Sequence, residues 1–321
     1  MQYRRLGRTG IKVSAICLGT MQFGWSADEE TSFAVMDKAL ELGYNFFDTA
    51  DIYSAWAPGN KGGETETIIG NWLASGRVRR QDLILASKVR GKMGEGPNDQ
   101  GLSRQHILNA IEASLERLQT DYIDLYQVHW PDEETPLEET LMVLNDLVRA
   151  GMVRYIGCSN YPAWLFTKSL WISDSLGLAR FDSLQPHYNL MHRAEFEREL
   201  QPLCLDQGIG VIPYSPLAGG FLTGKYRRDT ELPDSVRAEG VKRRYMHEQG
   251  FTAVDRLEEI GRHHGATIAQ TAIAWVLANP TVSSAIIGAN SVEQLVDTTA
   301  GAEIVLSAEE KQLLDETTAW K

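Results

Sequence analysis

The chain has 321 residues, of which 43% are hydrophobic and 23% are charged, and its formal net charge is −12 at pH 7. We expect residues 1–321 to form a single large domain, and the negative charge argues against nucleic acids or anionic membranes as partners. The N-terminus lacks the apolar core of a signal peptide, and no apolar run approaches membrane-spanning length. We therefore predict a cytoplasmic protein.

The cysteine and histidine positions do not suggest a metal site. Cys17, Cys158 and Cys204 are odd in number, widely spaced and free of any CxxC pair. Such spacing indicates neither a disulfide framework nor a thiolate metal site. His263 and His264 are adjacent and would point in different directions from a helix. We predict a protein of a reducing compartment without a bound metal.

Strand and helix patterns alternate through the first half of the chain, after a hairpin expected at residues 3–14. The expected strands are Ala15–Leu18, Asn45–Asp48, Leu83–Lys88, Ile123–Val128 and Val153–Cys158. The expected helices are Glu29–Leu42, Glu64–Leu73, Arg104–Leu118 with Ser103 as N-cap, and a helix ending at Ala150. For that last helix we predict Thr135 as N-cap, Pro136 at the first helical position and Glu138 as the capping-box partner.

The second half repeats the alternation. Its expected strands are Ser183–Gln185, Gly210–Tyr214 and Ala285–Ile287. Its expected helices are Ala163–Leu176, Glu195–Gln207, Ala253–His263, Ile268–Ala278 and two opened by capping boxes at Ser291–Gln294 and Ser307–Glu310. The segment from Ser215 to about Gly250 is predicted as a long binding loop. Eight strands alternating with helices favour a (β/α)8 barrel with an N-terminal hairpin and additional C-terminal helices.

Polar residues stand where these strands end, which is the functional face of such a barrel. Lys88 needs a counter-charge, and Asp48, from a tip two places away around the wall, can supply it. A Lys88 cation beside Tyr53 would lower the pKa of the phenol, while His129 could hydrogen-bond a carbonyl oxygen. Each residue alone could be structural, with His129 a core histidine and Lys88 a surface lysine. Together they predict a site that protonates a carbonyl oxygen.

The sequence resembles a known family at these residues. Asp48, Tyr53, Lys88 and His129 have the order and context of the catalytic tetrad of the aldo-keto reductases, and residues 43–50 and 156–161 resemble two family signatures. The resemblance covers essentially the whole chain and points to the branch of bacterial and potassium-channel β-subunit members. It implies an NADPH-dependent (β/α)8 barrel that reduces aldehydes or ketones. In that family the Tyr is the general acid, the Lys and Asp tune it, and the His orients the carbonyl.

The resemblance also implies a cofactor site. The nicotinamide end is matched by Ser159, Asn160 and Gln185 for the carboxamide and by Tyr214 for stacking on the ring. The pyrophosphate loop is matched by Ser215, Pro216, Leu217, Gly220 and Lys225, and the arginine that meets the 2′-phosphate by Arg237. The adenosine site is matched by Gly288, Asn290, Gln294, Asp297 and Thr298, where that branch often has Glu-Asn in place of Asp297-Thr298. Thr20, Met21 and Asp48 complete the expected cofactor contacts.

The charge pattern points to an anionic ligand on independent grounds. Between Lys225 and Arg244 seven basic residues accompany four acidic ones, a local excess of cations in an acidic protein. Because Arg offers bidentate contacts to phosphate, this pattern favours NADPH over NADH. Without the tetrad, a solvated basic loop would be the preferred interpretation.

Other nucleotide-binding functions fit the sequence less well. Residues 219–226 match a Walker A motif until Tyr226 replaces the Ser or Thr that binds Mg²⁺, and no GxGxxG follows an early strand. Two alternatives stay open: a slow-turnover, NADPH-binding regulatory subunit of the channel-β type, and a Schiff-base aldolase using Lys88. The tryptophans that could line a pocket for a small carbonyl substrate, or merely shield the site, are Trp25, Trp56, Trp130 and Trp164. The sequence leaves the substrate and the oligomeric state open.

Overall fold

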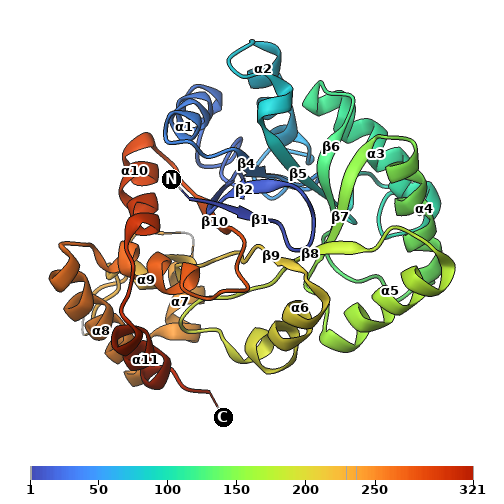
Figure 1. Cartoon of the computed structure of the whole chain (residues 1–321). Helices are drawn as coiled ribbons and strands as arrows, with labels where there is room; N and C mark the ends of the chain where they lie inside the picture. The colour runs from blue at the N-terminus through green and yellow to red at the C-terminus, as the bar shows by residue number, and fades with distance from the viewer. Residues whose placement is uncertain (1, 229, 236, 321) are drawn as a thin grey trace.

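Eight parallel strands form a ring with helices around it in the computed structural model, which describes residues 2–228, 230–235 and 237–320 (Figure 1). The strands are β3 (Ile16–Gly19), β4 (Phe46–Asp48), β5 (Ile84–Val89), β6 (Ile123–Val128), β7 (Val153–Ser159), β8 (Phe181–Gln185), β9 (Gly210–Val211) and β10 (Ala285–Gly288). They pair in the order β10-β3-β4-β5-β6-β7-β8-β9. An antiparallel hairpin of β1 (Tyr3–Arg5) and β2 (Lys12–Ser14) forms a separate two-stranded sheet.

The ring closes between β9 and β10, the strands at the two ends of this order, through irregular hydrogen bonds. Ser283 N donates to Val211 O at 2.8 Å, and Ile286 N donates to Pro213 O at 3.0 Å. β9 is only two residues long, shorter than the predicted strand to Tyr214, because Pro213 has no N–H to donate to a ladder. The predicted (β/α)8 barrel with its N-terminal hairpin is confirmed.

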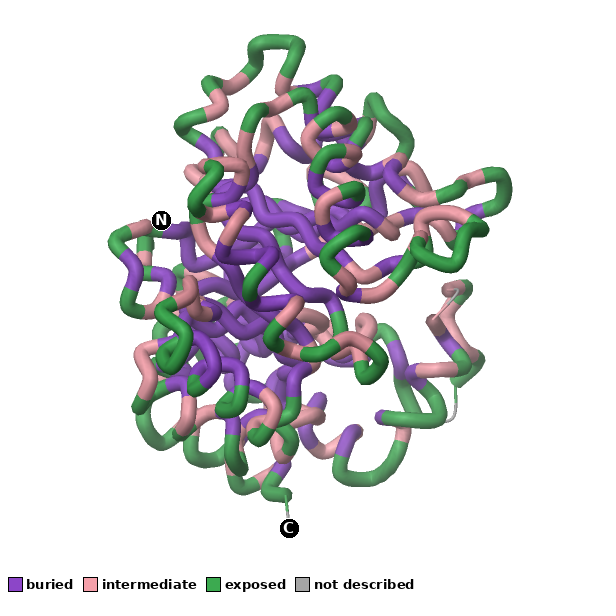
Figure 2. Tube along the Cα trace, turned by 90° about the vertical axis from the view of Figure 1, so that its right-hand side faces the viewer, coloured by how far each residue is buried: buried purple, intermediate pink, exposed green. Residues whose placement is uncertain are grey.

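Two hydrophobic cores follow from the alternation of strand side chains. The barrel interior is filled from the strands and closed by the hairpin with these buried residues: Leu6, Val13, Cys17, Phe46, Ile84, Ala86, Leu125, Ile212 and Ile286. A larger core lies between the strands and the surrounding helices. Figure 2 shows the buried residues gathered in the middle of the molecule and the exposed ones along its outer loops. Apolar side chains therefore fill the barrel below the strand tips.

The helices largely match the predicted ones. The main helices are α1 (Glu29–Glu41), α2 (Glu64–Ala74), α3 (Arg104–Leu118), α4 (Leu137–Arg149), α5 (Ala163–Leu176), α6 (Gln201–Gln207), α8 (Glu248–His264), α9 (Ile268–Leu277), α10 (Val292–Thr299) and α11 (Ala308–Thr317). A π-helical turn, η2 (Phe196–Leu200), precedes α6. The Ser103 cap of α3 and the capping box Ser307–Glu310 of α11 are confirmed. No helix in the described part of the chain is long and apolar enough to cross a membrane.

Two predicted helix starts are wrong in detail. Thr135 does not cap α4, because its hydroxyl donates instead to Asp132 at 2.7 Å, and Pro136 is the N-cap. At α10, Ser291 accepts from Gln294 N as predicted. The Gln294 side chain, however, accepts from Asn290 N at 2.7 Å rather than from Ser291 N. In both places a neighbouring polar group competes for the side chain that the motif assigns to the cap.

The segment from Ser215 to Gly250 is not one long loop. It contains the turn η3 (Ala218–Thr223) and helix α7 (Ala238–Tyr245), and α8 begins at Glu248 rather than at Ala253. Val241 and Tyr245, four residues apart, are buried on one side of α7. The basic residues 242–244 between them hide this helical period in the sequence.

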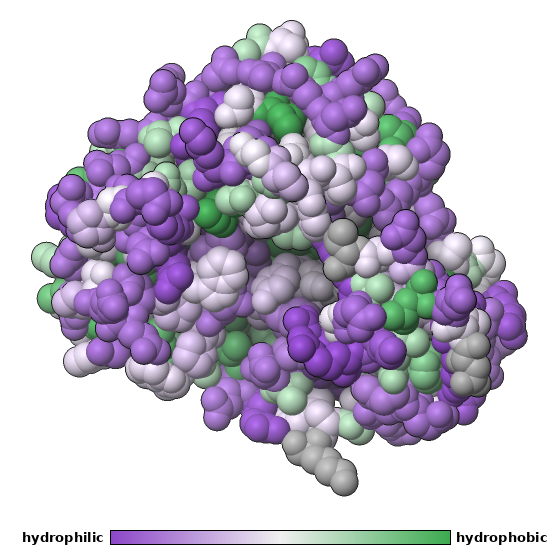
Figure 3. All heavy atoms as spheres, turned by 180° about the vertical axis from the view of Figure 1, so that it is seen from behind, coloured by the Kyte–Doolittle hydropathy of each residue, from purple (hydrophilic) through white to green (hydrophobic). Residues whose placement is uncertain are grey.

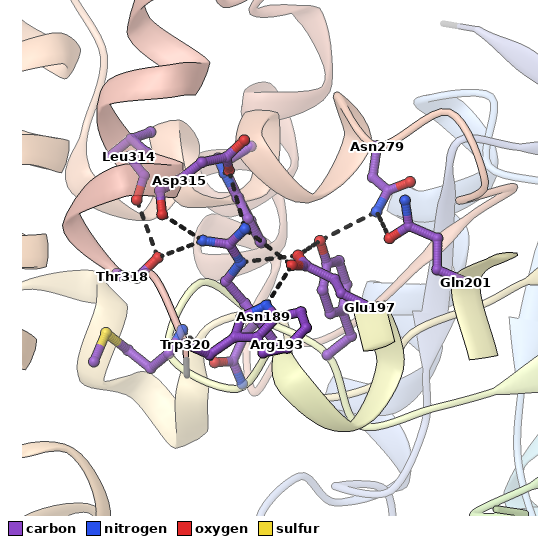
Figure 4. A network of polar contacts seen from close by, with 12 residues as sticks. Asn189, Arg193, Glu197, Gln201, Asn279, Leu314, Asp315, Thr318 and Trp320 are labelled. Carbon is purple, nitrogen blue, oxygen red and sulfur yellow. Dashed lines mark hydrogen bonds and ion pairs between the residues drawn. The ribbon is translucent and has the colours of Figure 1, made fainter. Parts of the chain in front are cut away.

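The C-terminal helix is tied to the segment that follows β8 (Figure 4). Arg193 donates to Glu197 Oε1 at 2.8 Å and to the carbonyl oxygen of Asp315 at 2.7 Å, and Trp320 Nε1 donates to Glu197 Oε2 at 2.8 Å. Thr318 accepts a further bond from Arg193 at 3.1 Å. The contacts to Asp315, Thr318 and Trp320 join residues more than a hundred positions apart and hold α11 against the barrel.

Candidate active site

The C-terminal ends of the strands converge on the face opposite the hairpin. Figure 3, turned by 180° from Figure 1, shows this face hollowed near its middle. Asp48 ends β4, Lys88 is the penultimate residue of β5, and His129 directly follows β6. Tyr53 lies in the loop after β4. Because β4, β5 and β6 are neighbours in the sheet, the four predicted catalytic side chains come together.

Lys88 is the centre of this group and is fully buried. Its ammonium group donates to Asp48 Oδ2 at 2.5 Å, to Thr49 O at 2.9 Å and to Tyr53 Oη at 2.8 Å. A lysine ammonium has three donors, so all are used. Asp48 comes from the adjacent strand, not from a tip two places away as predicted. Burial would lower the pKa of Lys88, but Asp48 and Tyr53 raise it above its ordinary value, so the group is a cation.

Asp48 is held from its other side by two glutamines. Its Oδ1 accepts from Gln127 Nε2 at 3.0 Å and from Gln185 Nε2 at 2.9 Å. The sequence analysis did not assign Gln127 to the site. The period of two in a strand places it on the same side as His129, two residues later, and this signal could have identified it. The carboxylate is therefore fixed by three donors from three strands.

The pKa of Tyr53 is not lowered overall, which corrects the prediction. Burial raises the pKa of Tyr53 to about 12, and Lys88 only partly opposes this effect. The prediction considered the cation and neglected the loss of solvent around the ring. At neutral pH the phenol keeps its proton and can donate it. The ammonium group at 2.8 Å can then stabilise the phenolate that remains.

His129 is a neutral imidazole beside Tyr53. Burial, followed by the charges of Lys88 and Arg90, holds the pKa of His129 well below its usual range. Its ring lies 5.9 Å from the Tyr53 ring between centroids, and its Nδ1 has no hydrogen-bond partner among the described residues. A neutral imidazole has one N–H donor. The Tyr53 hydroxyl and one His129 ring nitrogen are therefore two hydrogen-bond donors on neighbouring rings.

Indole rings surround the two donors. Trp130 stacks on His129 with centroids 3.8 Å apart, and Trp56 packs edge-on against both Tyr53 and Trp25. Trp164 is 68% exposed on α5, and no ring contact joins it to this cluster in the described structure. Three of the four tryptophans named from the sequence thus gather at the site.

The residues predicted for the nicotinamide end form a chain of hydrogen bonds across neighbouring strand tips. Ser159 Oγ donates to Gln185 O at 2.8 Å, Asn160 Nδ2 donates to His129 O at 3.0 Å, and Tyr214 donates to Asn160 Oδ1 at 2.9 Å. The Gln185 amide group donates to Asp48, as described above. The Tyr214 ring stacks on His187 with 5.2 Å between centroids. These residues therefore border the tetrad on the β7–β9 side.

Thr20 and Met21 lie at the tip of β3. The Thr20 hydroxyl donates to the carbonyl oxygen of Asp48 at 2.9 Å, and Met21 is partly exposed beside it. Both therefore stand at the same end of the barrel as the tetrad.

The model of the aldo/keto reductase family matches residues 15–319. The chain belongs to this family. It is 42% identical to an uncharacterized oxidoreductase from Bacillus subtilis, over 98% of this chain and 95% of that protein. It is 37% identical to a versiconal hemiacetal acetate reductase from Aspergillus parasiticus, over 98% and 96% of the two chains. It is 36% identical to a probable voltage-gated potassium channel subunit beta from Oryza sativa, over 95% and 92%. The protein is thus an aldo/keto reductase by family.

The cations after β9 fall into two groups. Arg228 is paired with Glu248 at 2.8 Å and with Asp255 at 3.0 Å, and Arg227 lies 3.8 Å from Glu258. Arg237 and Lys225 have no carboxylate partner among the described residues. Burial lowers the pKa of the Arg237 guanidinium, which is partly shielded from solvent. A partly buried cation without a counter-ion fits a phosphate group.

The backbone of the predicted pyrophosphate loop is tightly turned. Ser215 and Ala218 have positive φ angles of 58° and 51°, and Gly220 has a φ of 97°. A Cβ on Gly220 would lie 3.1 Å from Lys225 Cε, so the lysine side chain covers this turn. Pro216 and Leu217 lie within the turn, where Leu217 O accepts from Gly220 N at 2.9 Å. The segment predicted to bind the pyrophosphate is therefore a compact turn with a cation beside it.

The residues predicted for the adenosine end lie at the tip of β10 and along α10. Asn290 Oδ1 accepts from Ser26 Oγ at 2.7 Å, and Asp297 accepts from Gln270 Nε2 at 3.1 Å. Thr298 is buried, and Gly288 packs against the Gln22 side chain so closely that a Cβ there would lie 2.3 Å from it. Asn290 and Asp297 are thus engaged with protein partners at the surface of this segment.

Proposed function

We propose that this protein reduces aldehydes or ketones to alcohols with NADPH, and that Tyr53 is the general acid. The observation that carries the proposal is the Lys88 ammonium group, whose three hydrogen bonds fix Asp48, Thr49 and Tyr53 in one arrangement. Such preorganised charge is the usual source of transition-state stabilisation in enzymes.

Each side chain has a defined task in the proposed reaction. Tyr53 Oη and the His129 N–H bind the carbonyl oxygen and exclude water from it. NADPH supplies the hydride that reaches the carbonyl carbon. Tyr53 transfers its proton to the oxygen, which completes the alcohol, and Lys88 stabilises the resulting phenolate while Asp48 keeps the pair electrically neutral.

The cofactor preference is proposed from the cations after β9. Arg237 would hold the 2′-phosphate of NADPH, and Lys225 with the turn at Gly220 would hold the pyrophosphate. The absence of carboxylate partners for Arg237 and Lys225 among the described residues supports these roles. The already paired Arg227 and Arg228 are less suited to them.

The two alternative functions differ in how the structure bears on them. A slow regulatory subunit would keep the tetrad, and the probable channel subunit among the relatives keeps this alternative open. A Schiff-base aldolase needs a neutral amine as nucleophile. Since the pKa of Lys88 is raised and all three of its donors are occupied, aldolase chemistry is disfavoured.

The test is turnover at fixed NADPH concentration with a panel of aromatic and aliphatic aldehydes and ketones. We expect NADPH oxidation at turnover numbers of about 1 s⁻¹ or more for some of them. Tight NADPH binding with negligible turnover across the panel would support the regulatory alternative. A protein that neither binds NADPH nor reduces any of these substrates would contradict both the reductase and the regulatory function.

A further inference from the structure

A second group of buried charged side chains lies behind the tetrad. Glu66 of α2 is fully buried and accepts from Ser87 Oγ at 2.5 Å and from Arg117 Nε at 2.8 Å. Ser87 precedes Lys88 on β5, so the two side chains point to opposite sides of the strand. Asp51, between Asp48 and Tyr53 in sequence, is also fully buried. This group therefore stands directly behind the catalytic one.

The charges of this group do not balance if every carboxyl group is ionised. Asp48 already neutralises Lys88, and Glu66 neutralises Arg117 at 2.7 Å. Among the described residues, no cation lies within hydrogen-bond distance of the Asp51 carboxyl group. Its Oδ1 accepts from Ile52 N at 2.6 Å, and its Oδ2 has no partner among the described residues. An ionised carboxylate so placed is far more costly than a protonated one.

We propose that Asp51 carries a proton in the folded enzyme and is a positioning residue, because a neutral carboxyl group lets the loop that carries Tyr53 stay packed against β5. The inference rests on the proposed function, because its effect on the reaction requires Tyr53 to be the proton donor. The backbone agrees, since Asp51 N donates to Lys88 O at 3.3 Å. Burial, and then the charge of Glu66, raise the pKa of Asp51 to about 8.

The loop is anchored on both sides of Tyr53, so a displacement of Asp51 would be passed on to the Tyr53 side chain. On the far side of Tyr53, Ser54 has a φ of 68° and its hydroxyl donates to Phe23 O at 2.6 Å. A Cβ on Gly91 would lie 2.6 Å from Ile52 Cβ and 3.1 Å from Asp51 Oδ1. Tyr53 thus lies between two fixed residues, Asp51 and Ser54. Repulsion between an ionised Asp51 and Glu66 would be relieved by moving this loop, and with it the Tyr53 hydroxyl.

The groups that face Asp51 come from four elements: Glu66 from α2, Arg117 from α3, Lys88 from β5 and Tyr126 from β6. The Tyr126 hydroxyl is buried without a partner among the described residues. Burial, and then Asp51 and Glu66, hold the pKa of Tyr126 well above its usual range. Lys88 also titrates above its ordinary pKa. Asp51 is therefore the member of the group expected to lose a proton near pH 8.

The test compares Asp51→Asn, which imitates the protonated side chain, with Asp51→Leu, which cannot form its hydrogen bonds. Both are assayed for carbonyl reduction from pH 6 to 10. We expect Asp51→Asn to stay within about twofold of the wild type near pH 7 and to keep its kcat above pH 8, where that of the wild type falls. Asp51→Leu should lose about tenfold in kcat with NADPH affinity unchanged. Equal loss in both variants, or an unchanged alkaline fall in Asp51→Asn, would overturn the proposal.

A matched control is Asp182→Asn. Asp182 lies near the start of β8, at the end of the barrel away from Tyr53, and burial raises its pKa to about 6. This variant removes another carboxyl group with a raised pKa and should leave the pH profile of kcat unchanged above pH 8. A profile altered in the same way as that of Asp51→Asn would mean that the alkaline fall is a property of the whole fold.

Two readouts do not depend on turnover. The infrared difference between wild type and Asp51→Asn at pH 7 should contain the C=O stretch of a protonated carboxyl group. In addition, the folded-state pKa of about 8 exceeds the unfolded value of about 3.9. Between these two pKa values the native state binds one more proton than the unfolded state. The stabilisation from that proton therefore falls as pH rises from about 4 to 8. Asp51→Asn should remove that fall. If the protein reduces no carbonyl compound, the proposed function fails, but the infrared band and the pH dependence of stability still test whether Asp51 is protonated. If both signals are absent, Asp51 is not protonated and this inference is wrong.

Discussion

The two sides of the barrel mouth differ in how their charges are satisfied. At the ends of β4–β6, the Lys88 ammonium group has all three donors occupied, and Asp48 is fixed by three partners. After β9, Arg237 and Lys225 have no carboxylate partner among the described residues. The first side is complete within the protein, whereas the second would be completed by an anion. In the proposed function, the first side is preorganised for the chemistry, and the second side supplies the binding energy for the anionic cofactor.

This difference predicts different consequences of mutation on the two sides. Removing one partner from the closed network leaves a buried charge behind, so stability and activity should fall together. Removing an unpaired cation leaves nothing uncompensated in the free protein. Stability without cofactor should then be unchanged or higher, and only binding should suffer.

The largest effect is expected for Lys88→Met. Asp48 would become an uncompensated buried carboxylate, and Tyr53 would lose the cation that stabilises its phenolate. The free energy of unfolding should fall by about 3 to 5 kcal/mol. Carbonyl reduction should fall by roughly a thousandfold. Urea unfolding and steady-state kinetics measure the two quantities.

A double variant separates the two effects of Lys88→Met. Asp48→Asn combined with Lys88→Met removes both charges, so it should regain much of the stability lost in the single variant while remaining inactive. An active and fully stable Lys88→Met protein would contradict both the ion pair and its role in tuning Tyr53.

The next effect in size is expected for Tyr53→Phe. The ring and its packing against Trp56 are kept, and only the proton donor is removed. Carbonyl reduction should fall by about a hundredfold or more, with NADPH affinity nearly intact. Kinetics and fluorescence titration of NADPH check both parts. Near-normal turnover would exclude Tyr53 as the general acid.

The convergence of Asp48, Tyr53, Lys88 and His129 could be predicted from the sequence, because strand ends in a parallel barrel must meet on one face, and these residues lie at or just after three neighbouring strand ends. The strand period places Gln127 on the same side as His129, but its role as a second donor to Asp48 is visible only in the packed fold. The predicted direction of the Tyr53 pKa shift was wrong. The effect of the Lys88 charge can be inferred from the sequence, whereas the burial that outweighs this effect depends on the packed fold.

Helix α7 shows a second limit of sequence analysis. Its buried residues Val241 and Tyr245 provide one turn of apolar period, too little to stand out against three consecutive basic residues. Likewise, Thr135 fits the cap motif, yet the carboxylate of Asp132 captures its hydroxyl. Longer and more strongly periodic helices such as α3 were predicted to within a residue. Sequence patterns therefore locate elements reliably, while competition between polar neighbours determines local contacts.

The smallest effect, and the one that tests the open side of the mouth, is expected for Arg237→Ala. A bidentate contact to a terminal phosphate contributes roughly 1.5 to 3 kcal/mol, so NADPH affinity should fall by about tenfold to a hundredfold. NADH lacks that phosphate, so its affinity should hardly change. Stability without cofactor should not fall, because the described residues provide no carboxylate partner that the substitution would strand. Fluorescence titration measures the affinities for NADPH and NADH, and urea unfolding measures the stability without cofactor.

Arg228→Ala is the matched control for Arg237→Ala, since it removes the same side chain from the same segment but from a pair of ion pairs with Glu248 and Asp255. It should leave the ratio of NADPH to NADH affinity unchanged. Equal weakening of both cofactors in Arg237→Ala would assign Arg237 to the pyrophosphate or to the fold of the segment. If Arg237→Ala changed neither affinity, the phosphate would have to be bound by Lys225 or by an arginine that first leaves its carboxylate. The cations on this side would then not be open, and the contrast with the tetrad would fail.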